Sequence, residues 1–163
     1  PEKEWATDGA SGREKNVINS LALDPKNLED QNWKLKEKYE KMQENEVRYE
    51  TYNMEDAELA VVAYGTTARI AMNAVEMAKK EGINVGIIRP ITLFPFPEKV
   101  VGEAADKVDS FLAVEMSTGQ MVEDVKLAVN GKKPVNFYGR TGGMIPSPEE
   151  IYEEIKKHLG GDR

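Results

Sequence analysis

Two short runs in the sequence combine residue types that could bind an anion. The first run is Gly65, Thr66 and Thr67, and the second is Arg140, Thr141, Gly142 and Gly143. An arginine beside flexible glycines can present a fork of donors to a carboxylate or a phosphate. Backbone N–H groups at the start of a helix attract the same ligands. The alternative is that these residues only reverse the chain and cap helices.

Glu115 and His158 are two further side chains that could do acid–base chemistry. Glu115 ends an apolar run, where its carboxylate could act as a general base or could accept hydrogen bonds from the next turn. No histidine or second carboxylate lies near it in sequence, so we favour the structural role. His158 falls near the end of a C-terminal helix, where its charge complements the helix dipole. The sequence therefore predicts no catalytic residue.

The composition excludes several kinds of site and partner. The 163 residues include no cysteine and one histidine, which excludes disulfides, thiolate-ligated zinc or iron–sulfur sites and multi-histidine metal sites. The net charge of −7 argues against a nucleic-acid partner. No apolar run is long enough for a membrane span, and no signal-peptide pattern is present. We expect a cytoplasmic protein without a membrane partner.

Strand and helix patterns alternate after Asn53 and indicate an α/β fold. Apolar runs predict strands at 59–64, 85–89, 111–115 and 135–138, and amphipathic segments after each of them predict helices. Thr66 or Thr67 is expected to cap the first of these helices, and Ser147 with Glu150 to form a capping box at the last. The pattern predicts a three-layer α/β/α domain with a mostly parallel five-stranded sheet.

The fifth strand is expected at 46–53, where Val47, Tyr49 and Tyr52 favour a pleated surface. Its link to the next strand is about five residues long, which is too short for a parallel crossover. This strand should therefore run antiparallel, at an edge of the sheet or beside its sequence neighbour.

The first 45 residues differ in composition from the rest of the chain. Residues 1–56 hold 9 basic and 14 acidic residues, and both tryptophans lie there. Asp24 and Pro25 begin a charged helix with one narrow apolar stripe, made of Leu28, Leu35, Tyr39 and Met42. Such a stripe must lie against the body of the protein or against another chain. We expect a linker arm at 1–45 and an α/β domain at 46–163, excised from a longer polypeptide because the chain starts with Pro1.

Seven motifs, in order along nearly the whole chain, resemble one enzyme family. They are GREKN at 12–16, ENEVRYE at 44–50, AYGT at 63–66, IRPITLFPFP at 88–97, VEMS at 114–117, GQM at 119–121 and YGRTGG at 138–143. The series resembles the C-terminal part of the alpha subunit of 2-oxoacid:ferredoxin oxidoreductases. The branched-chain 2-oxoisovalerate type (VorB-like) is most similar, and the 2-oxoglutarate type comes next.

The resemblance implies a fold like the transketolase C-terminal domain and a non-catalytic role within an oxidoreductase. The parent reaction is the oxidative decarboxylation of a 2-oxoacid with coenzyme A to acyl-CoA, CO2 and reduced ferredoxin. Thiamine diphosphate, Mg and the iron–sulfur clusters would lie elsewhere in the complex and none on this chain. The implied partners are a beta, thiamine-binding subunit and a ferredoxin-like subunit.

Two alternatives to a pure scaffold stay open. The loops that contain Gly65 and Arg140 could contact the phosphates of coenzyme A in the assembled enzyme. The helix that carries Leu28 and Met42 could instead join two copies of the chain as a homodimer.

Overall fold

A computed structural model of the chain describes residues 3–159. The chain divides into two compact units, Pro1–Glu40 and Lys41–Arg163. The described residues before Pro25 contain turns but no helix or strand. No helix among residues 3–159 has the length and apolar character that crossing a bilayer requires.

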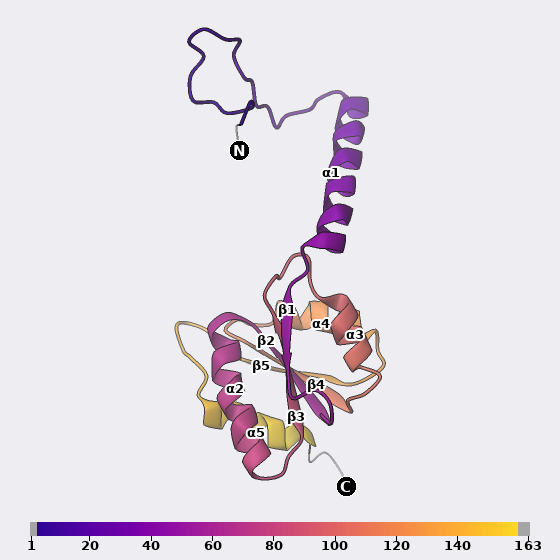
Figure 1. Cartoon of the computed structure of the whole chain (residues 1–163), viewed down its shortest axis with the longest axis vertical. Helices are drawn as coiled ribbons and strands as arrows, with labels where there is room; N and C mark the ends of the chain where they lie inside the picture. The colour runs from indigo at the N-terminus through magenta and orange to yellow at the C-terminus, as the bar shows by residue number, and fades with distance from the viewer. Residues whose placement is uncertain (1–2, 160–163) are drawn as a thin grey trace. The chain divides into compact units, whose positions relative to one another are not determined.

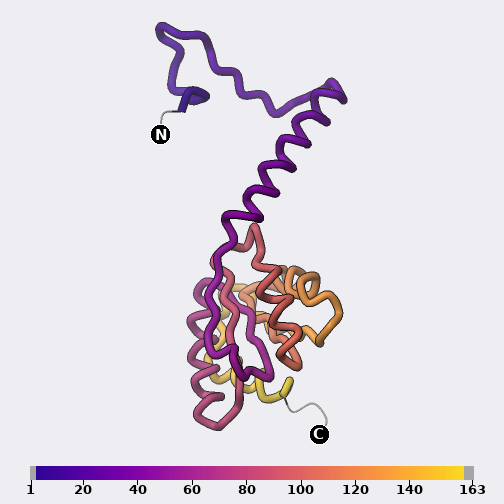
Figure 2. Tube along the Cα trace, turned by 45° about the vertical axis from the view of Figure 1, so that its right-hand side comes forward, coloured from indigo at the N-terminus to yellow at the C-terminus, as the bar shows by residue number. Residues whose placement is uncertain are grey.

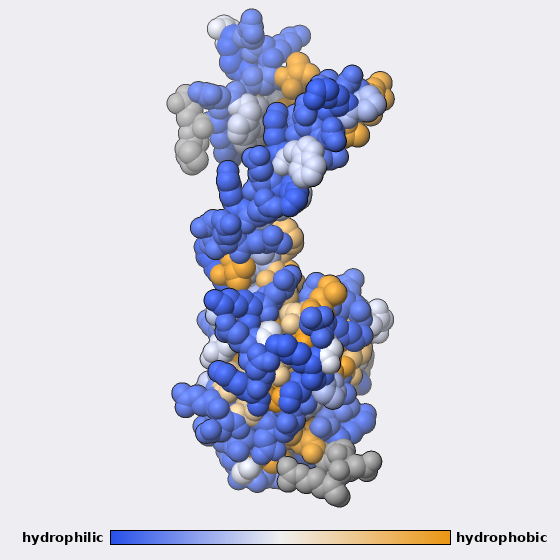
Figure 3. Space-filling model, turned by 90° about the vertical axis from the view of Figure 1, so that its right-hand side faces the viewer, coloured by the Kyte–Doolittle hydropathy of each residue, from blue (hydrophilic) through white to orange (hydrophobic). Residues whose placement is uncertain are grey.

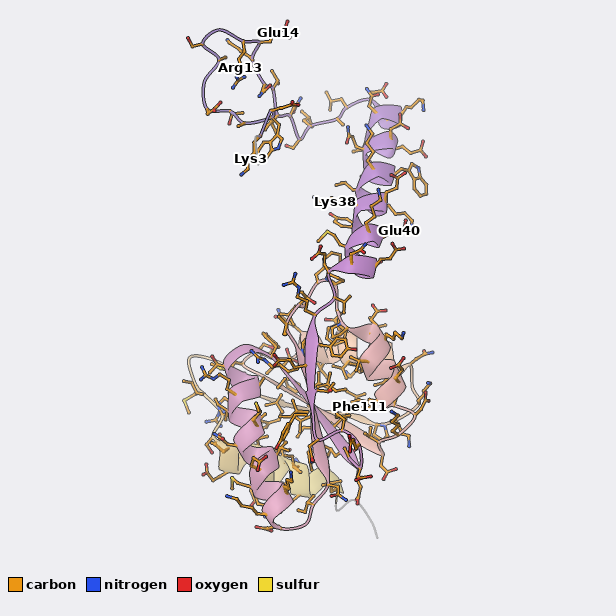
Figure 4. The ribbon with its side chains drawn as sticks, in the orientation of Figure 1. Lys3, Arg13, Glu14, Lys38, Glu40 and Phe111 are labelled. Atoms are coloured by element: carbon orange, nitrogen blue, oxygen red, sulfur yellow. The ribbon has the colours of Figure 1, made fainter. Side chains whose placement is uncertain are left out.

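Helix α1 (Pro25–Asn45) begins where the sequence predicts (Figure 1). The Asp24 carboxylate accepts the backbone N–H of Asn27 at 2.8 Å, which is the geometry of an N-cap. No residue of α1 is buried, and Leu28 and Leu35 are about half exposed. Charged side chains such as Lys38 and Glu40 project from the helix in different directions (Figure 4).

Five strands form one sheet in the order β1-β3-β2-β4-β5 (Figure 1). The strands are β1 (Tyr49–Tyr52), β2 (Leu59–Ala63), β3 (Val85–Pro90), β4 (Ser110–Glu115) and β5 (Val135–Gly139). Strands β2 to β5 are parallel, and β1 runs antiparallel to β3 at the edge. The predicted mixed sheet is confirmed. Of the two positions left open for the first strand, the edge is correct, because β1 pairs with β3 and not with its sequence neighbour β2.

Helices cover both faces of the sheet (Figures 1 and 2). Helices α2 (Gly65–Lys80) and α5 (Pro148–Leu159) pack on one face, and α3 (Glu98–Ala104) and α4 (Met121–Val129) pack on the other. Within β2, Val61 faces the α2–α5 side and Val62 faces the α3–α4 side, and both are fully buried. Phe111 of β4 fills the α3–α4 side (Figure 4). A strand covered on both faces needs the unbroken apolar run that the sequence has there. The predicted three-layer fold is confirmed.

Helix α5 begins with the predicted N-cap, and helix α2 does not. The N–H of Glu150 donates to Ser147 Oγ at 3.1 Å, and the N–H of Ser147 donates to Glu150 Oε2 at 2.8 Å, so the predicted capping box is confirmed. The predicted cap by Thr66 or Thr67 is wrong, because Tyr64 holds the N-cap position without a side-chain hydrogen bond. Gly65 turns the chain at a φ of +55°, so both threonines already lie inside the first turn.

Candidate functional site

The candidate residues lie at one edge of the sheet, where the parallel strands β2 to β5 all end. We call this the carboxyl edge, and the opposite edge the amino edge. The strand order changes direction between β2 and β4, because β3 lies on one side of β2 and β4 on the other. Crevices at such a switch point are where open α/β sheets bind ligands. The predicted loops therefore occupy the functional edge of this fold.

The structure places the two candidate runs on separate parts of this edge. Strand β4 lies between β2 and β5, so the run at Gly65 and the run at Arg140 are two strand spacings apart, about 10 Å. Gly65 and Thr66 are exposed, whereas Thr67 is buried and cannot meet a ligand from solvent. In the second run Thr141, Gly142 and Gly143 are all exposed. Two small loops, rather than one joint cradle, are present.

Arg140 has an internal partner. Its Nη1 atom lies 3.3 Å from Oε1 of Glu150, and its side chain keeps 29% of its exposure. The carboxylate of Glu150 also accepts the N–H of Ser147 at 2.8 Å. Ser147 first, and then Arg140 and Tyr138, hold the pKa of Glu150 below its usual value. An external anion would have to share the guanidinium with Glu150.

Glu115 is fully buried at the end of β4. Its Oε2 accepts backbone N–H groups from Gln120 (3.2 Å) and Met121 (2.9 Å), and its Oε1 accepts that of Val122 (2.9 Å). The Ser117 hydroxyl donates to Oε2 at 3.0 Å. Backbone donors at the start of α4 thus surround the carboxylate. The positive end of the helix dipole stabilises its negative charge there. The expected hydrogen bonds from the next turn to Glu115 are confirmed.

His158 lies in the last turn of α5, as predicted. Its Nε2 atom is 3.4 Å from Oε2 of Glu154, one turn earlier on the same helix. This contact gives the imidazole a local carboxylate partner and no link to the carboxyl edge.

Sequence reasoning missed a groove of about 610 Å³ at the carboxyl edge beside β3. Its walls come from the loop after β3 and from the segment that enters β1. The lining residues are Gln43, Glu44, Val47, Tyr49, Leu93, Phe94, Pro95, Phe96, Pro97, Glu98, Lys99, Val100 and Asp124. Burial, and then the nearby Glu115 and Glu123, raise the pKa of Asp124. The aromatic and proline residues at 93–97 mark one wall of this groove in the sequence.

The family resemblance places thiamine diphosphate, Mg and the iron–sulfur clusters elsewhere in the complex. Iron–sulfur clusters are ligated mainly by cysteine thiolates, and the sequence has no cysteine. Across residues 3–159, no group of three or more histidine, aspartate or glutamate side chains could hold a metal ion. This chain therefore supplies no thiolate ligand for a cluster.

Known proteins resemble this chain over most of its sequence, and solved structures share its fold. The family described as pyruvate:ferredoxin oxidoreductase core domain II matches residues 57–151, more than half of the chain. The ketoisovalerate oxidoreductase subunit VorB of Methanothermobacter thermautotrophicus is 46% identical over 160 residues, which are 98% of this chain and 45% of that subunit. The 2-oxoglutarate synthase subunit KorA of Methanothermobacter marburgensis is 39% identical over 62% of this chain and 27% of that subunit.

Solved structures give the same fold at low sequence identity. The 2-oxoglutarate:ferredoxin oxidoreductase from Magnetococcus marinus aligns with a TM-score of 0.69 and 18% identity over 92% of this chain and 26% of that chain. A split-gene transketolase aligns with a TM-score of 0.61 and 19% identity over 71% of this chain and 42% of that chain. The predicted transketolase-like fold is confirmed. This chain spans less than half the length of its VorB relatives. By sequence and by fold, it belongs to the 2-oxoacid:ferredoxin oxidoreductase family, as a core domain II.

Proposed function

We propose that this chain is a domain of the alpha subunit of a branched-chain 2-oxoacid:ferredoxin oxidoreductase and serves there as a scaffold and subunit-contact module. The observation that carries the proposal is the 46% identity with VorB over 98% of the chain, which includes the arm. The match with KorA is weaker and covers 62% of the chain. The whole enzyme would convert a 2-oxoacid and coenzyme A to acyl-CoA, CO2 and reduced ferredoxin.

The contacts of the titratable groups at the carboxyl edge support a scaffold role. Glu115 accepts backbone hydrogen bonds at the start of α4, and Arg140 is paired with Glu150. Both arrangements join a strand end to a neighbouring helix, and neither leaves a group aimed at a reacting atom. Thiamine diphosphate, Mg and the iron–sulfur clusters would lie on the rest of the complex, with a thiamine-binding beta subunit and a ferredoxin-like subunit as partners, in the cytoplasm.

The test compares the isolated chain with a hybrid subunit. In the hybrid, this chain replaces the matched region of Methanothermobacter thermautotrophicus VorB, and each protein is combined with the other subunits of that enzyme. Reduction of a viologen dye is measured with 2-oxoisovalerate, coenzyme A and thiamine diphosphate. We expect turnover with the hybrid and none with the isolated chain alone. Turnover by the isolated chain, or an assembled hybrid without turnover, would refute the proposal.

A second candidate function is contact with the phosphates of coenzyme A through the strand-end loops. It is favoured by the partial exposure of Arg140 and by the lack of a side-chain cap at the start of α2, beside Gly65 and Thr66. Calorimetry on the hybrid complex should show weaker coenzyme A binding for Arg140→Ala. The control is Glu150→Gln, which removes the charge of the partner but keeps the guanidinium, so binding should persist. Unchanged coenzyme A binding in the Arg140→Ala complex would rule out this function.

A further inference from the structure

The two edges of the sheet expose different side chains. Six large apolar residues in the loops of the carboxyl edge are between 41% and 57% exposed: Ile91, Leu93, Phe94, Met116, Met144 and Ile145. We call these six residues the carboxyl rim. The amino-edge loops, at 53–58, 81–84, 105–109 and 130–134, are all described, and none of them exposes a large apolar side chain to this degree.

The cationic residues are divided between the edges as well. Arginines at the carboxyl edge enter β1, start α2, end β3 and follow β5: Arg48, Arg69, Arg89 and Arg140. Lysines predominate at the amino edge, namely Lys79, Lys80, Lys107, Lys132 and Lys133, whereas the carboxyl edge has Lys99 at the start of α3. Arg89 pairs with Glu50 at 2.8 Å, and Arg140 pairs with Glu150, so much of the arginine charge is locally neutralised.

This division matches the difference between an interface and a free surface. Interface centres are enriched in aromatic residues, Met and Arg and depleted in Lys, Asp and Glu. Arginine keeps spare donors when it is ion-paired, and it loses less hydration than lysine when a partner covers it. Apolar side chains stand out among polar ones on the sheet unit (Figure 3). Six half-exposed large apolar side chains at one edge, with none in the loops of the other, make the carboxyl edge the candidate contact surface.

We propose that the carboxyl rim docks against the part of the alpha subunit that lies outside the region matched by this chain. This inference rests on the proposed function. In the VorB relatives the matched region is 45% of the subunit, so more than half of the polypeptide lies outside it. A tethered neighbour is present at high effective concentration and covers an apolar surface before a free partner can. The surface that fits the rim is apolar at its centre and carries carboxylates or carbonyls opposite the arginines.

The lack of native cysteine allows a direct test by single-cysteine labelling. Met144→Cys places a thiol on the rim, and Leu127→Cys places the control thiol on α4, where Leu127 is 76% exposed. Maleimide labelling of each thiol is followed by peptide mass spectrometry, in the isolated chain and in the VorB hybrid subunit. We expect similar rates for both thiols in the isolated chain. In the hybrid, Met144→Cys should label at least about tenfold more slowly, and Leu127→Cys should be unchanged.

The other outcomes overturn the docking proposal or separate it from the proposed function. Equal labelling of Met144→Cys in both proteins would show that the rim is not covered. Protection that grows with the concentration of the isolated chain would assign the rim to a second copy, and equal protection of both thiols would exclude a specific rim contact. A hybrid with turnover and an unprotected rim refutes the docking alone. A protected rim in a hybrid without turnover refutes the proposed function alone.

Discussion

The carboxylate of Glu115, the last residue of β4, accepts the backbone N–H of Val122 in the first turn of α4 at 2.9 Å. Glu115 is fully buried, so its side chain is part of the core as well as the cap of a helix. The negative charge lies at the positive end of the helix dipole, and it satisfies backbone donors that have no partner within the helix. One side chain thus joins the end of β4 to the start of α4.

Replacing Glu115 should be among the most destabilising single changes in the domain. Glu115→Ala leaves buried N–H groups without acceptors and opens a cavity, so we expect a loss of about 3 kcal/mol or more in the free energy of unfolding. Glu115→Gln keeps one acceptor oxygen and should lose less. Urea unfolding measures both, with Glu123→Ala as the control on the exposed face of α4, where a change below about 0.5 kcal/mol is expected. A Glu115→Ala protein as stable as the control would contradict the capping role.

The stability provided by Glu150 should depend on pH in a defined direction. The Ser147 N–H, and then Arg140 and Tyr138, lower the pKa of Glu150 from its usual value of 4.5. A lowered folded-state pKa adds stability that is fully present above the unfolded value and is lost as the pH falls through the folded value. Wild type should therefore exceed Glu150→Gln in unfolding free energy at neutral pH, and the difference should shrink below about pH 4. A pH-independent difference would show that the charge of Glu150 contributes nothing.

Local signals in the sequence predicted most of this fold. The unbroken apolar run at Leu59 to Ala63 indicates a strand covered on both faces, and Ser147 with Glu150 indicates a capping box. Each of these signals lies within a few consecutive residues. The cap of α2 was missed because the left-handed conformation of Gly65, which the threonine pattern does not encode, moved the helix start.

Non-local features of the candidate site could not be derived in this way. The pairing of β1 with β3, rather than with β2, depends on contacts between segments about 40 residues apart, such as that of Thr51 with Ile88. The groove beside β3 forms only where the loop at 93–97 meets the segment at 43–49. No local sequence pattern predicts that contact. The pairing of Arg140 with Glu150 likewise joins a loop to a helix. Residue types at the carboxyl edge were predictable, but their partners were not.

Gly86 should resist substitution because the segment that follows β1 packs directly against it. A Cβ atom at this position of β3 would lie 2.9 Å from the backbone oxygen of Asn53 and would also collide with Sδ of Met54. We expect Gly86→Ala to lower the free energy of unfolding by roughly 1–3 kcal/mol in urea titrations. Gly102→Ala in α3 is the comparison, because its Cβ atom would meet only the backbone oxygen of Ala128, at the less severe distance of 3.3 Å, and alanine gains about 1 kcal/mol of helix propensity. Equal effects at the two glycines would rule out the packing explanation.

The apolar stripe of α1 should join two copies of the chain if no other surface covers it. Leu28, Leu35 and Met42 repeat every seven residues, and Asn32 and Tyr39 occupy the alternate core positions of the same heptads. A single asparagine at such a position favours a two-stranded coiled coil in one register. We expect sedimentation at high concentration to show a dimer that Leu35→Glu abolishes. Lys34→Glu, off the stripe, also introduces a carboxylate and should leave the dimer intact. A chain that stays monomeric at every concentration would exclude homodimerisation through α1.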